Sequence, residues 1–257
     1  MIRNCILIVF LALSTTAIYA QNNAINAGEK LTYTASYNMS GVLTDIAQVT
    51  METSKVQTSK ATLLRLKCTA ATYSKWDSFF KIRDLYESYV NPSNLTPYLY
   101  NRDVNEGSYF KNMKYTFSHS SNTVKSVMKK KNDYVENNNV KINSGTKDIV
   151  STLYSMRILD YKKMSVGTQK TFNIIFDNEE VKGIITYLGK ETISTAIGRK
   201  ECYKLAVGSS EANVLQGKNS NFVWLTADEN KIMVYGKFKI PVGNGELKIK
   251  SASGLKN

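Results

Sequence analysis

One stretch of this sequence has a clear helical repeat, and it limits what the rest of the chain can form. Residues 147–163 read KDIVSTLYSMRILDYKK, and apolar Ile149, Leu153 and Met156 recur at the spacing of one helical face. Asp148 can cap the amino end, and two lysines suit the carboxyl end. A lone amphipathic helix needs an apolar surface beside it. We therefore expect it to pack against a sheet, with Leu153 and Met156 buried.

The remaining chain reads as short strands separated by turns. In segment 28–37, apolar residues alternate with polar ones, which is the period-two pattern of a half-buried strand. Further strands are predicted at 44–56, 59–74, 79–90, 97–104, 108–118, 123–130, 168–176, 181–188, 191–196, 202–207, 221–225, 232–240 and 245–250. The Asn-rich segment 132–145 reads as a connection into the helix. We predict a mainly β fold, a large antiparallel sheet curved into an open barrel or a sandwich, with one amphipathic α-helix packed against it.

The first twenty residues have the composition of a cleaved export signal. Arg3 precedes an apolar run at 6–13, and Ala20 is a small residue at a suitable cleavage point. The run is too short to span a bilayer, and Cys5 lies before it, which argues against a lipid anchor. We expect a signal peptide at 1–20, cleaved after Ala20, and one β-rich domain at 21–257. Its location is then the periplasm or the exterior, as a protein of the cell envelope.

Charge and cysteine content fit an exported chain. There are 34 Lys and Arg residues against 21 Asp and Glu residues, a formal net charge of +13. This excess suits an anionic surface and is compatible with peripheral membrane contact, although scattered lysines also serve solubility. Nucleic acid is not an expected partner outside the cell. Cys68 and Cys202 remain after cleavage, and the sequence leaves open whether they form a disulfide or stay as buried thiols.

Several phrases occur in a familiar order along the chain. They are GEKLTY at 28–33, RDLYES at 83–88, KDIVSTLYSMR at 147–157 and VWLTAD at 223–228. Their order and spacing resemble the exported bacterial family called domain of unknown function 3108, over nearly the whole mature chain. One departure is the lack of a proline near Met233. The resemblance implies an envelope-located, mostly antiparallel β fold, and it implies no activity.

Common catalytic signatures are missing from the sequence. His119 is the single histidine, and its FSHSS context predicts a solvated loop residue rather than a base. No G-x-S-x-G elbow accompanies it, and no His and Cys cluster suits zinc. P-loop and dinucleotide glycine patterns are also missing. We therefore predict no catalytic, metal or cofactor site, and a protein that is not an enzyme.

Charged and aromatic residues nevertheless suggest a structural or binding cluster. Its members are Arg83, Asp84, Tyr86, Glu87, Tyr154, Arg157 and Trp224. Asp84 and Glu87 are an odd number of positions apart, so a regular strand places them on opposite faces. Arg157 projects near the apolar side of the helix and needs a buried carboxylate, for which Asp84 or Glu87 is the predicted partner. Alternatively, these carboxylates pair with a strand arginine such as Arg83 or Arg102.

Three functions remain open. The leading one is a non-enzymatic envelope protein that binds an apolar, amphiphilic or glycan ligand, a lipid among them, or an envelope protein partner. The second is a structural or assembly factor, and the third is a carboxylate-based glycan hydrolase. A concave apolar cavity would favour the first function, and a filled interior with an exposed patch the second. Paired carboxylates in an open groove would favour the third.

Overall fold

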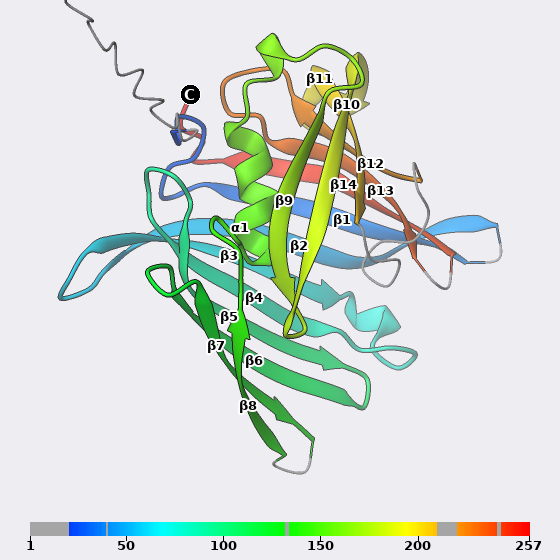
Figure 1. The fold of residues 1–257 in the computed structure, drawn as a ribbon. Coiled ribbons are helices and arrows are strands. Elements are labelled where there is room, and N and C mark those ends of the chain that lie inside the picture. The colour runs from blue at the N-terminus through cyan, green and yellow to red at the C-terminus, as the bar shows by residue number, and fades with distance from the viewer. Residues whose placement is uncertain (1–20, 40, 132–133, 210–219, 241–242) are drawn as a thin grey trace, which may run out of the picture.

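Strands make up most of the computed structural model, which describes residues 21–39, 41–131, 134–209, 220–240 and 243–257 (Figure 1). The strands are β1 (Lys30–Met39), β2 (Val42–Gln57), β3 (Thr62–Thr72), β4 (Arg83–Val90), β5 (Pro97–Glu106), β6 (Tyr109–Ser118), β7 (Thr123–Lys130), β8 (Val135–Lys141), β9 (Gln169–Phe176), β10 (Glu179–Thr195), β11 (Gly198–Ser209), β12 (Asn221–Thr226), β13 (Met233–Ile240) and β14 (Gly243–Ser253). They form one antiparallel sheet in the order β8-β7-β6-β5-β4-β3-β2-β1-β14-β13-β12-β11-β10-β9. The predicted mainly β fold with a large antiparallel sheet is confirmed. Within the described ranges the edges β8 and β9 do not pair, so the curved sheet stays open.

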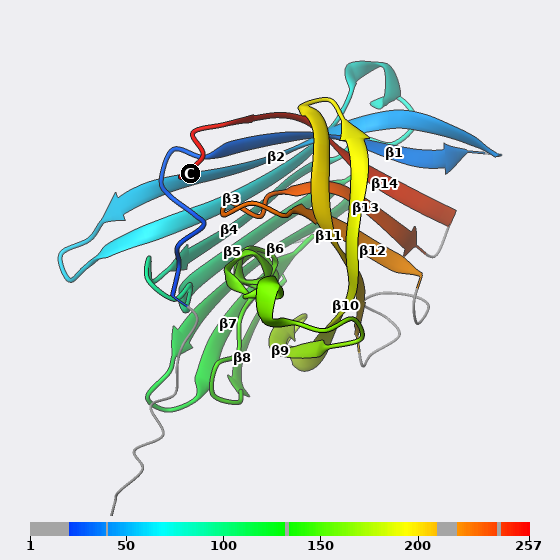
Figure 2. The same ribbon diagram turned by 90° about the horizontal axis from the view of Figure 1, so that it is seen from above.

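The path of the chain explains where the helix lies. Strands β1 to β8 are laid down side by side, the chain then crosses to the other edge, and β9 to β14 return until β14 pairs with β1. Helix α1 (Ile149–Ser155) is part of this crossing. Figures 1 and 2 show α1 in the hollow of the curved sheet, with β3 and β4 on one side and β9 on the other. Contacts of α1 with these three strands agree with that view.

The helix begins where the sequence predicts and ends early. The Asp148 carboxylate accepts a hydrogen bond from the Ser151 amide at 2.8 Å, which confirms the expected cap. After Ser155 the chain tightens into two 3₁₀ turns, Met156–Ile158 and Tyr161–Lys163, instead of the predicted helix over 147–163. The turns bring the Tyr161 hydroxyl within 2.8 Å of the Met156 carbonyl. No helix in the described ranges is long and apolar enough to span a membrane.

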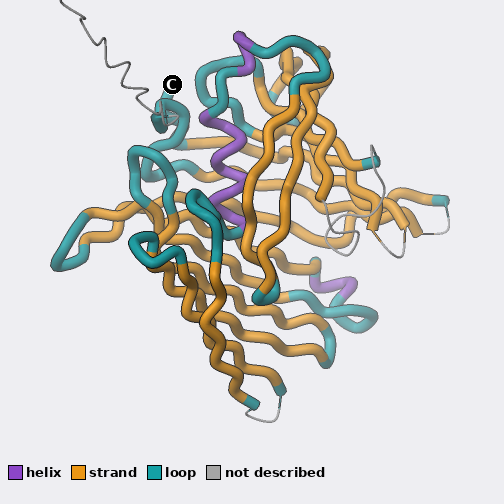
Figure 3. Tube along the Cα trace, viewed as in Figure 1, coloured by secondary structure: helices purple, strands orange, loops and turns teal. Residues whose placement is uncertain are grey.

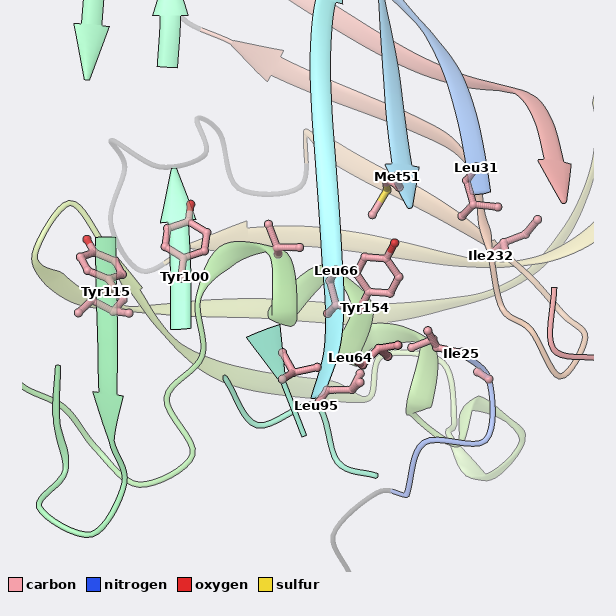
Figure 4. Close-up of a cluster of buried hydrophobic side chains, with 14 of the residues drawn as sticks. Ile25, Leu31, Met51, Leu64, Leu66, Leu95, Tyr100, Tyr115, Tyr154 and Ile232 are labelled. Atoms are coloured by element: carbon pink, nitrogen blue, oxygen red, sulfur yellow. The ribbon is translucent and has the colours of Figure 1, made fainter. Parts of the chain in front are cut away.

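The hydrophobic core forms around the helix, on a face one position away from the predicted one. Val150 and Tyr154 point into the main cluster with residues such as Leu66, as Figure 4 shows for Tyr154 and Leu66. Met156 is 5% exposed, as predicted, and joins a second cluster that includes the buried ring of Tyr203. Leu153 is 37% exposed, so its predicted burial is wrong. Five of the seven helix residues are buried, Val150, Ser151, Thr152, Tyr154 and Ser155, and Leu153 lies on the side that remains exposed.

Two strand predictions need correction. The part of segment 132–145 that the structure describes holds strand β8, whose side chains alternate between exposed and half-buried. This edge strand tolerates the Asn-rich sequence because one of its faces meets solvent. Residues 181–188 and 191–196 form one strand, β10, instead of two (Figure 3). Gly189, at a φ of +106°, marks a shift in register with β11 there, so the strand bends instead of turning back.

Candidate functional site

Two of the predicted cluster residues, Arg83 and Glu87, lie on the face of β4 that points away from α1. Arg83 Nη2 lies 2.6 Å from Asp77 Oδ2. The carboxylate of Glu87 accepts a hydrogen bond from Arg65 Nε at 3.0 Å, across the β3–β4 pair. Asp84 lies on the opposite face, as the odd spacing predicts, so Asp84 and Glu87 cannot flank one substrate.

Arg157 is buried as expected, but its predicted partner is wrong. Its Nη1 and Nη2 atoms donate to the two carboxylate oxygens of Glu29 at 2.6 and 2.7 Å. Its Nε also donates to the carbonyl oxygen of Asn230 at 3.0 Å. Asp84 and Glu87 lie on β4, whereas Arg157 follows α1 and reaches Glu29, the residue just before β1. This fork is a structural ion pair that ties the helical crossing to the start of the sheet.

Two further predicted residues, Tyr154 and Trp224, occupy separate places. The Tyr154 ring lies 5.5 Å from the Arg157 guanidinium carbon, and burial raises the pKa of Tyr154 well above its usual value. Trp224, on β12, packs against Tyr235 with ring centroids 4.7 Å apart. The Lys204 ammonium lies 5.2 Å from the Trp224 ring. The seven predicted residues therefore do not form one cluster.

A different group of residues meets on the concave face of the sheet. We call it the Arg102 cleft, formed by Tyr86, Arg102, Lys111 and Tyr115 of the sheet and by residues 176–178 of the β9–β10 hairpin. Strand pairing sets Arg102 opposite Tyr86. Its guanidinium carbon lies 5.8 Å from the Tyr86 ring and 4.7 Å from the Phe176 ring. The Arg102 guanidinium thus lies within reach of two aromatic rings, whose faces attract a cation.

The tip of the β9–β10 hairpin lies on the concave side of the sheet (Figure 1), where it contacts the cleft residues of β5 and β6. Asp177 and Asn178 have φ values of +49° and +69°, which are typical of a two-residue hairpin turn. One Asp177 oxygen accepts hydrogen bonds from Arg102 at 2.7 Å and from Lys111 at 2.6 Å. The Asn178 amide donates to the Tyr115 hydroxyl at 3.0 Å. Polar contacts therefore attach the tip to β5 and β6.

Burial and neighbouring charges set the electrostatics of the cleft. Burial alone would lower the pKa of Arg102, but Asp177 and two tyrosine hydroxyls raise it above its usual value. Burial, with the Asp84 carboxylate second, raises the pKa of Tyr86 to about 12. Glu106, at the end of β5, also has a raised pKa, first from burial and then from Asp84. Arg102 therefore remains charged while the hydroxyl groups around it remain neutral.

Polar atoms without a partner gather here. Four of the five buried side-chain polar atoms that lack a hydrogen-bond partner among the described residues belong to Tyr100, Arg102, Ser126 and Asn178. Tyr100 and Ser126 both pair with Tyr115 in adjacent strands, so they lie on the same inner face. Buried polar groups normally find partners, and a local group of exceptions suggests a site for water or a polar ligand.

Beside the cleft is a groove of about 600 Å³. Its lining includes Lys111, Met128, Asn138, Val140 and Asp177. This volume lies in the range of small-molecule sites, roughly 300–1,000 Å³. The groove therefore offers space for a ligand against Lys111, while Arg102 lies behind Asp177, which lines the groove and pairs with both cations.

Two further hollows lie elsewhere. One of about 560 Å³ is lined by Ile193, Tyr235 and Lys248, near the tip of the β10–β11 hairpin. Another of about 220 Å³ is lined partly by Lys147. Burial lowers the pKa of Lys147 to about 8, and its ammonium donates to the Leu95 carbonyl at 2.8 Å. Neither hollow combines two buried cations with partnerless polar atoms.

His119 and the cysteines are placed as follows. His119 lies in the turn after β6, as predicted, but it is half-buried instead of solvated, with its Nε2 atom 2.6 Å from the Pro97 carbonyl oxygen and its ring stacked on Phe117. Cys68 and Cys202 are free thiols. Burial raises the pKa of each thiol to about 12. The thiols are thus poor nucleophiles in the folded protein.

Sequence reasoning named Arg102 only as an alternative partner for Asp84 or Glu87. Its actual partner, Asp177, lies 75 residues further along the chain. A local signal did exist, because the turn after 168–176 was predicted and an Asp-Asn pair suits positive φ values. What the sequence could not show is which strands that turn would reach.

Comparisons with known proteins agree with this fold. A family model described as protein of unknown function (DUF3108) matches residues 32–250. No match was found among curated proteins. A β-barrel-like protein of domain of unknown function DUF1849 from Brucella abortus is similar at a TM-score of 0.56, with 7% identity over 88% of this chain and 97% of that one. A Bacteroides fragilis protein with a YmcC-like fold has 9% identity over 89% and 96% of the two chains, at a TM-score of 0.37, too low to establish a shared fold.

Proposed function

This chain belongs to the family of proteins of unknown function DUF3108, and we propose that it is an exported envelope protein that binds an amphiphilic ligand without transforming it. The ligand occupies the groove beside the Arg102 cleft. Its polar end lies against the cleft, and its apolar part lies along Met128 and Val140. The family fixes no activity, so the proposal depends on the geometry of this site.

The observation that supports binding is the concentration of partnerless polar atoms beside a groove. A purely structural interior would pair its polar groups, because each unpaired buried group costs about 1–3 kcal/mol. Four such groups from two strands, β5 and β7, and one hairpin tip meet on the concave face instead. A ligand that carries a polar end and an apolar body would satisfy them and would fill the groove.

Export is proposed from residues 1–20, which lie outside the described residues. Their basic start, apolar run and small residue at Ala20 suit a cleaved signal. Intact-mass measurement of the protein from the envelope fraction should find a chain that starts at Gln21. Recovery of the full-length chain from the cytosol would contradict export.

The binding proposal is tested by native mass spectrometry of protein purified gently from the envelope. We expect a bound amphiphile that leaves at high collision energy. Met128→Trp places a large ring in the groove and should remove the adduct. Val127→Trp is the matched control, because residue 127 precedes residue 128 on the opposite face of β7, and it should keep the adduct.

Equal adducts in both variants would show that the ligand lies elsewhere. No adduct in the wild-type protein, even after incubation with dodecanoate and with dodecan-1-ol, would contradict the binding function itself.

A further inference from the structure

We propose that Arg102 and Lys111 form the seat for an anionic head group, and that the Asp177 carboxylate occupies this seat when no ligand is bound. This inference rests on the proposed binding function and specifies its ligand class: a single-chain amphiphile with a carboxylate or phosphate head. The hairpin tip then acts as an internal competitor for the ligand.

Arg102 and Lys111 are much more deeply buried than the single carboxylate that they share. The side chains of Arg102 and Lys111 are 12% and 8% exposed, whereas that of Asp177 is 43% exposed. Both cations contact the same Asp177 oxygen. The pair therefore carries one positive charge more than the carboxylate between them, at a place where water screens charge weakly. An incoming anion with several oxygens could engage both cations at once.

Arg102 also has unused bonding capacity. Its Nη1 atom donates to Asp177, but its Nε atom has no partner among the described residues. A guanidinium binds carboxylate and phosphate best through two parallel hydrogen bonds. Asp177 uses one oxygen for both cations, so it fills the seat incompletely. A ligand oxyanion that is free to orient can make the fork that the tethered carboxylate does not make.

Asp177 is placed where it can withdraw. It lies in the two-residue turn between β9 and β10, and its side chain faces solvent for almost half of its surface. The hairpin itself is anchored two residues earlier by Ile175, which is 1% exposed and belongs to the main core. The tip can therefore shift without removing the hairpin from the core. The partnerless Asn178 side-chain oxygen shows that the tip does not satisfy its own polar groups.

The surrounding charges favour an anion in the seat over one deeper in the sheet. Asp84 and Glu106 lie beyond Arg102, and Asp84 accepts hydrogen bonds from the Asn105 amide and the Tyr86 hydroxyl. These carboxylates prevent an anion from passing further along β5. The groove carries Lys130 and Lys141 together with Glu136 and Glu179, which are balanced in charge. The excess positive charge is thus confined to Arg102 and Lys111.

The test measures binding of dodecanoate, dodecyl phosphate and dodecan-1-ol by isothermal titration calorimetry to the mature chain and three variants. Arg102→Met and Lys111→Met should each weaken binding of the two anions roughly tenfold or more, with little change for the alcohol. Asp177→Asn should strengthen anion binding several-fold, because it removes the competitor. Asp160→Asn, which removes an exposed carboxylate paired with Lys163, is the control and should change nothing.

The gain of affinity in Asp177→Asn is the decisive sign, because a merely structural carboxylate would give a loss. Acetate and inorganic phosphate, tested as competitors, separate a head group from a free anion. If acetate and inorganic phosphate bind as tightly as the amphiphiles, the site recognises a free anion, and the proposal of a ligand with an alkyl chain is wrong. If Arg102→Met does not fold, Arg102→Lys takes its place, because it keeps the positive charge but cannot form two parallel hydrogen bonds, and it should also weaken anion binding. The Asp177→Asn measurement does not depend on either variant.

Failure of this inference differs from failure of the proposed function. If the anions and the alcohol bind equally and no variant changes the ratio, the anionic seat is wrong while the amphiphile site stands. If none of the three probes binds, the proposed function is contradicted.

Discussion

Arg157 and Glu29 form a two-pronged ion pair inside the protein, with both nitrogen–oxygen distances below 2.8 Å and the two side chains 4% and 0% exposed. Removing one partner of such a pair strands a buried charge, which costs about 3–5 kcal/mol. Arg157→Met should therefore lower the free energy of unfolding by that amount, as measured by urea denaturation. Adding Glu29→Gln should recover part of the loss.

Glu87→Gln is the matched control for this cycle, because Glu87 pairs with Arg65 on the other face of β4. Its effect should add to that of Arg157→Met within about 0.5 kcal/mol. Strict additivity with Glu29→Gln as well would show that the pair carries no coupling energy.

The helix face gives a second prediction. Met156→Ala should destabilise the protein by about 2–5 kcal/mol, because it empties a packed position that is 5% exposed. Leu153→Ala should cost less than about 1 kcal/mol, since Leu153 is 37% exposed. Thermal or urea unfolding of the two variants decides the matter. A larger loss for Leu153→Ala would mean that the helix presents its other face to the sheet.

Asp148 should make stability depend on pH. Burial raises the pKa of this carboxyl above its usual value, against hydrogen bonds from Ser88 and Ser151 that lower it. A raised pKa in the folded state means that the group contributes stability below its unfolded pKa, near 4, and that this contribution is lost as pH rises through the folded pKa. The stability of the wild-type protein relative to Asp148→Asn should therefore fall as the pH rises above about 4.

Asp160→Asn provides the opposite case for comparison. The hydrogen bond from Lys163 lowers the pKa of Asp160, so its contribution is present above about pH 4 and is lost only in more acidic solution. Urea denaturation at several pH values gives the difference in unfolding free energy between the wild-type protein and each variant. Above about pH 4 this difference should change with pH for Asp148→Asn and stay constant for Asp160→Asn. A flat difference for Asp148→Asn would contradict its raised pKa.

The thiols of Cys68 and Cys202 should be unreactive until the protein unfolds. With pKa values of about 12, about one thiol in ten thousand is ionised at a pH of about 8. Ellman's reagent should therefore react slowly with the native protein and quickly with both thiols in guanidinium chloride. Absence of titratable thiols in the denatured, unreduced chain would instead reveal a disulfide between Cys68 and Cys202.

Most of the strands could be predicted because a half-buried strand alternates in polarity, and β1 shows this alternation clearly. Strand β8 was not predicted because its half-buried face carries Glu136 and Asn138 and only one apolar residue, Val140, so the sequence lacks the alternation of a half-buried strand. The bend in β10 was not predicted because a glycine is equally typical of a turn and of a β-bulge. Only the pairing with β11, which continues past Gly189, shows that this one is a bulge.

The site could be predicted only in part, because it depends on contacts between distant segments. Burial of Arg157 followed from its place in the predicted helix, but its partner Glu29 lies 128 residues earlier, just before β1, and no local pattern links the two. Similarly, Tyr86 was named for its position in β4. Its role beside Arg102 depends on the hairpin tip at Asp177, which the open curvature of the sheet brings across the hollow.

The central claim, that an amphiphile lies in the groove beside the Arg102 cleft, is tested most directly by covalent labelling. A dodecanoate with a diazirine in its chain would be bound to the mature protein and irradiated, and the labelled peptides identified by mass spectrometry. We predict labels in β6, β7 and the β9–β10 hairpin, at or next to Lys111, Met128 and residues 176–178. Labels confined to the hollow lined by Ile193 and Tyr235, or spread over the outer face of the sheet, would contradict the account.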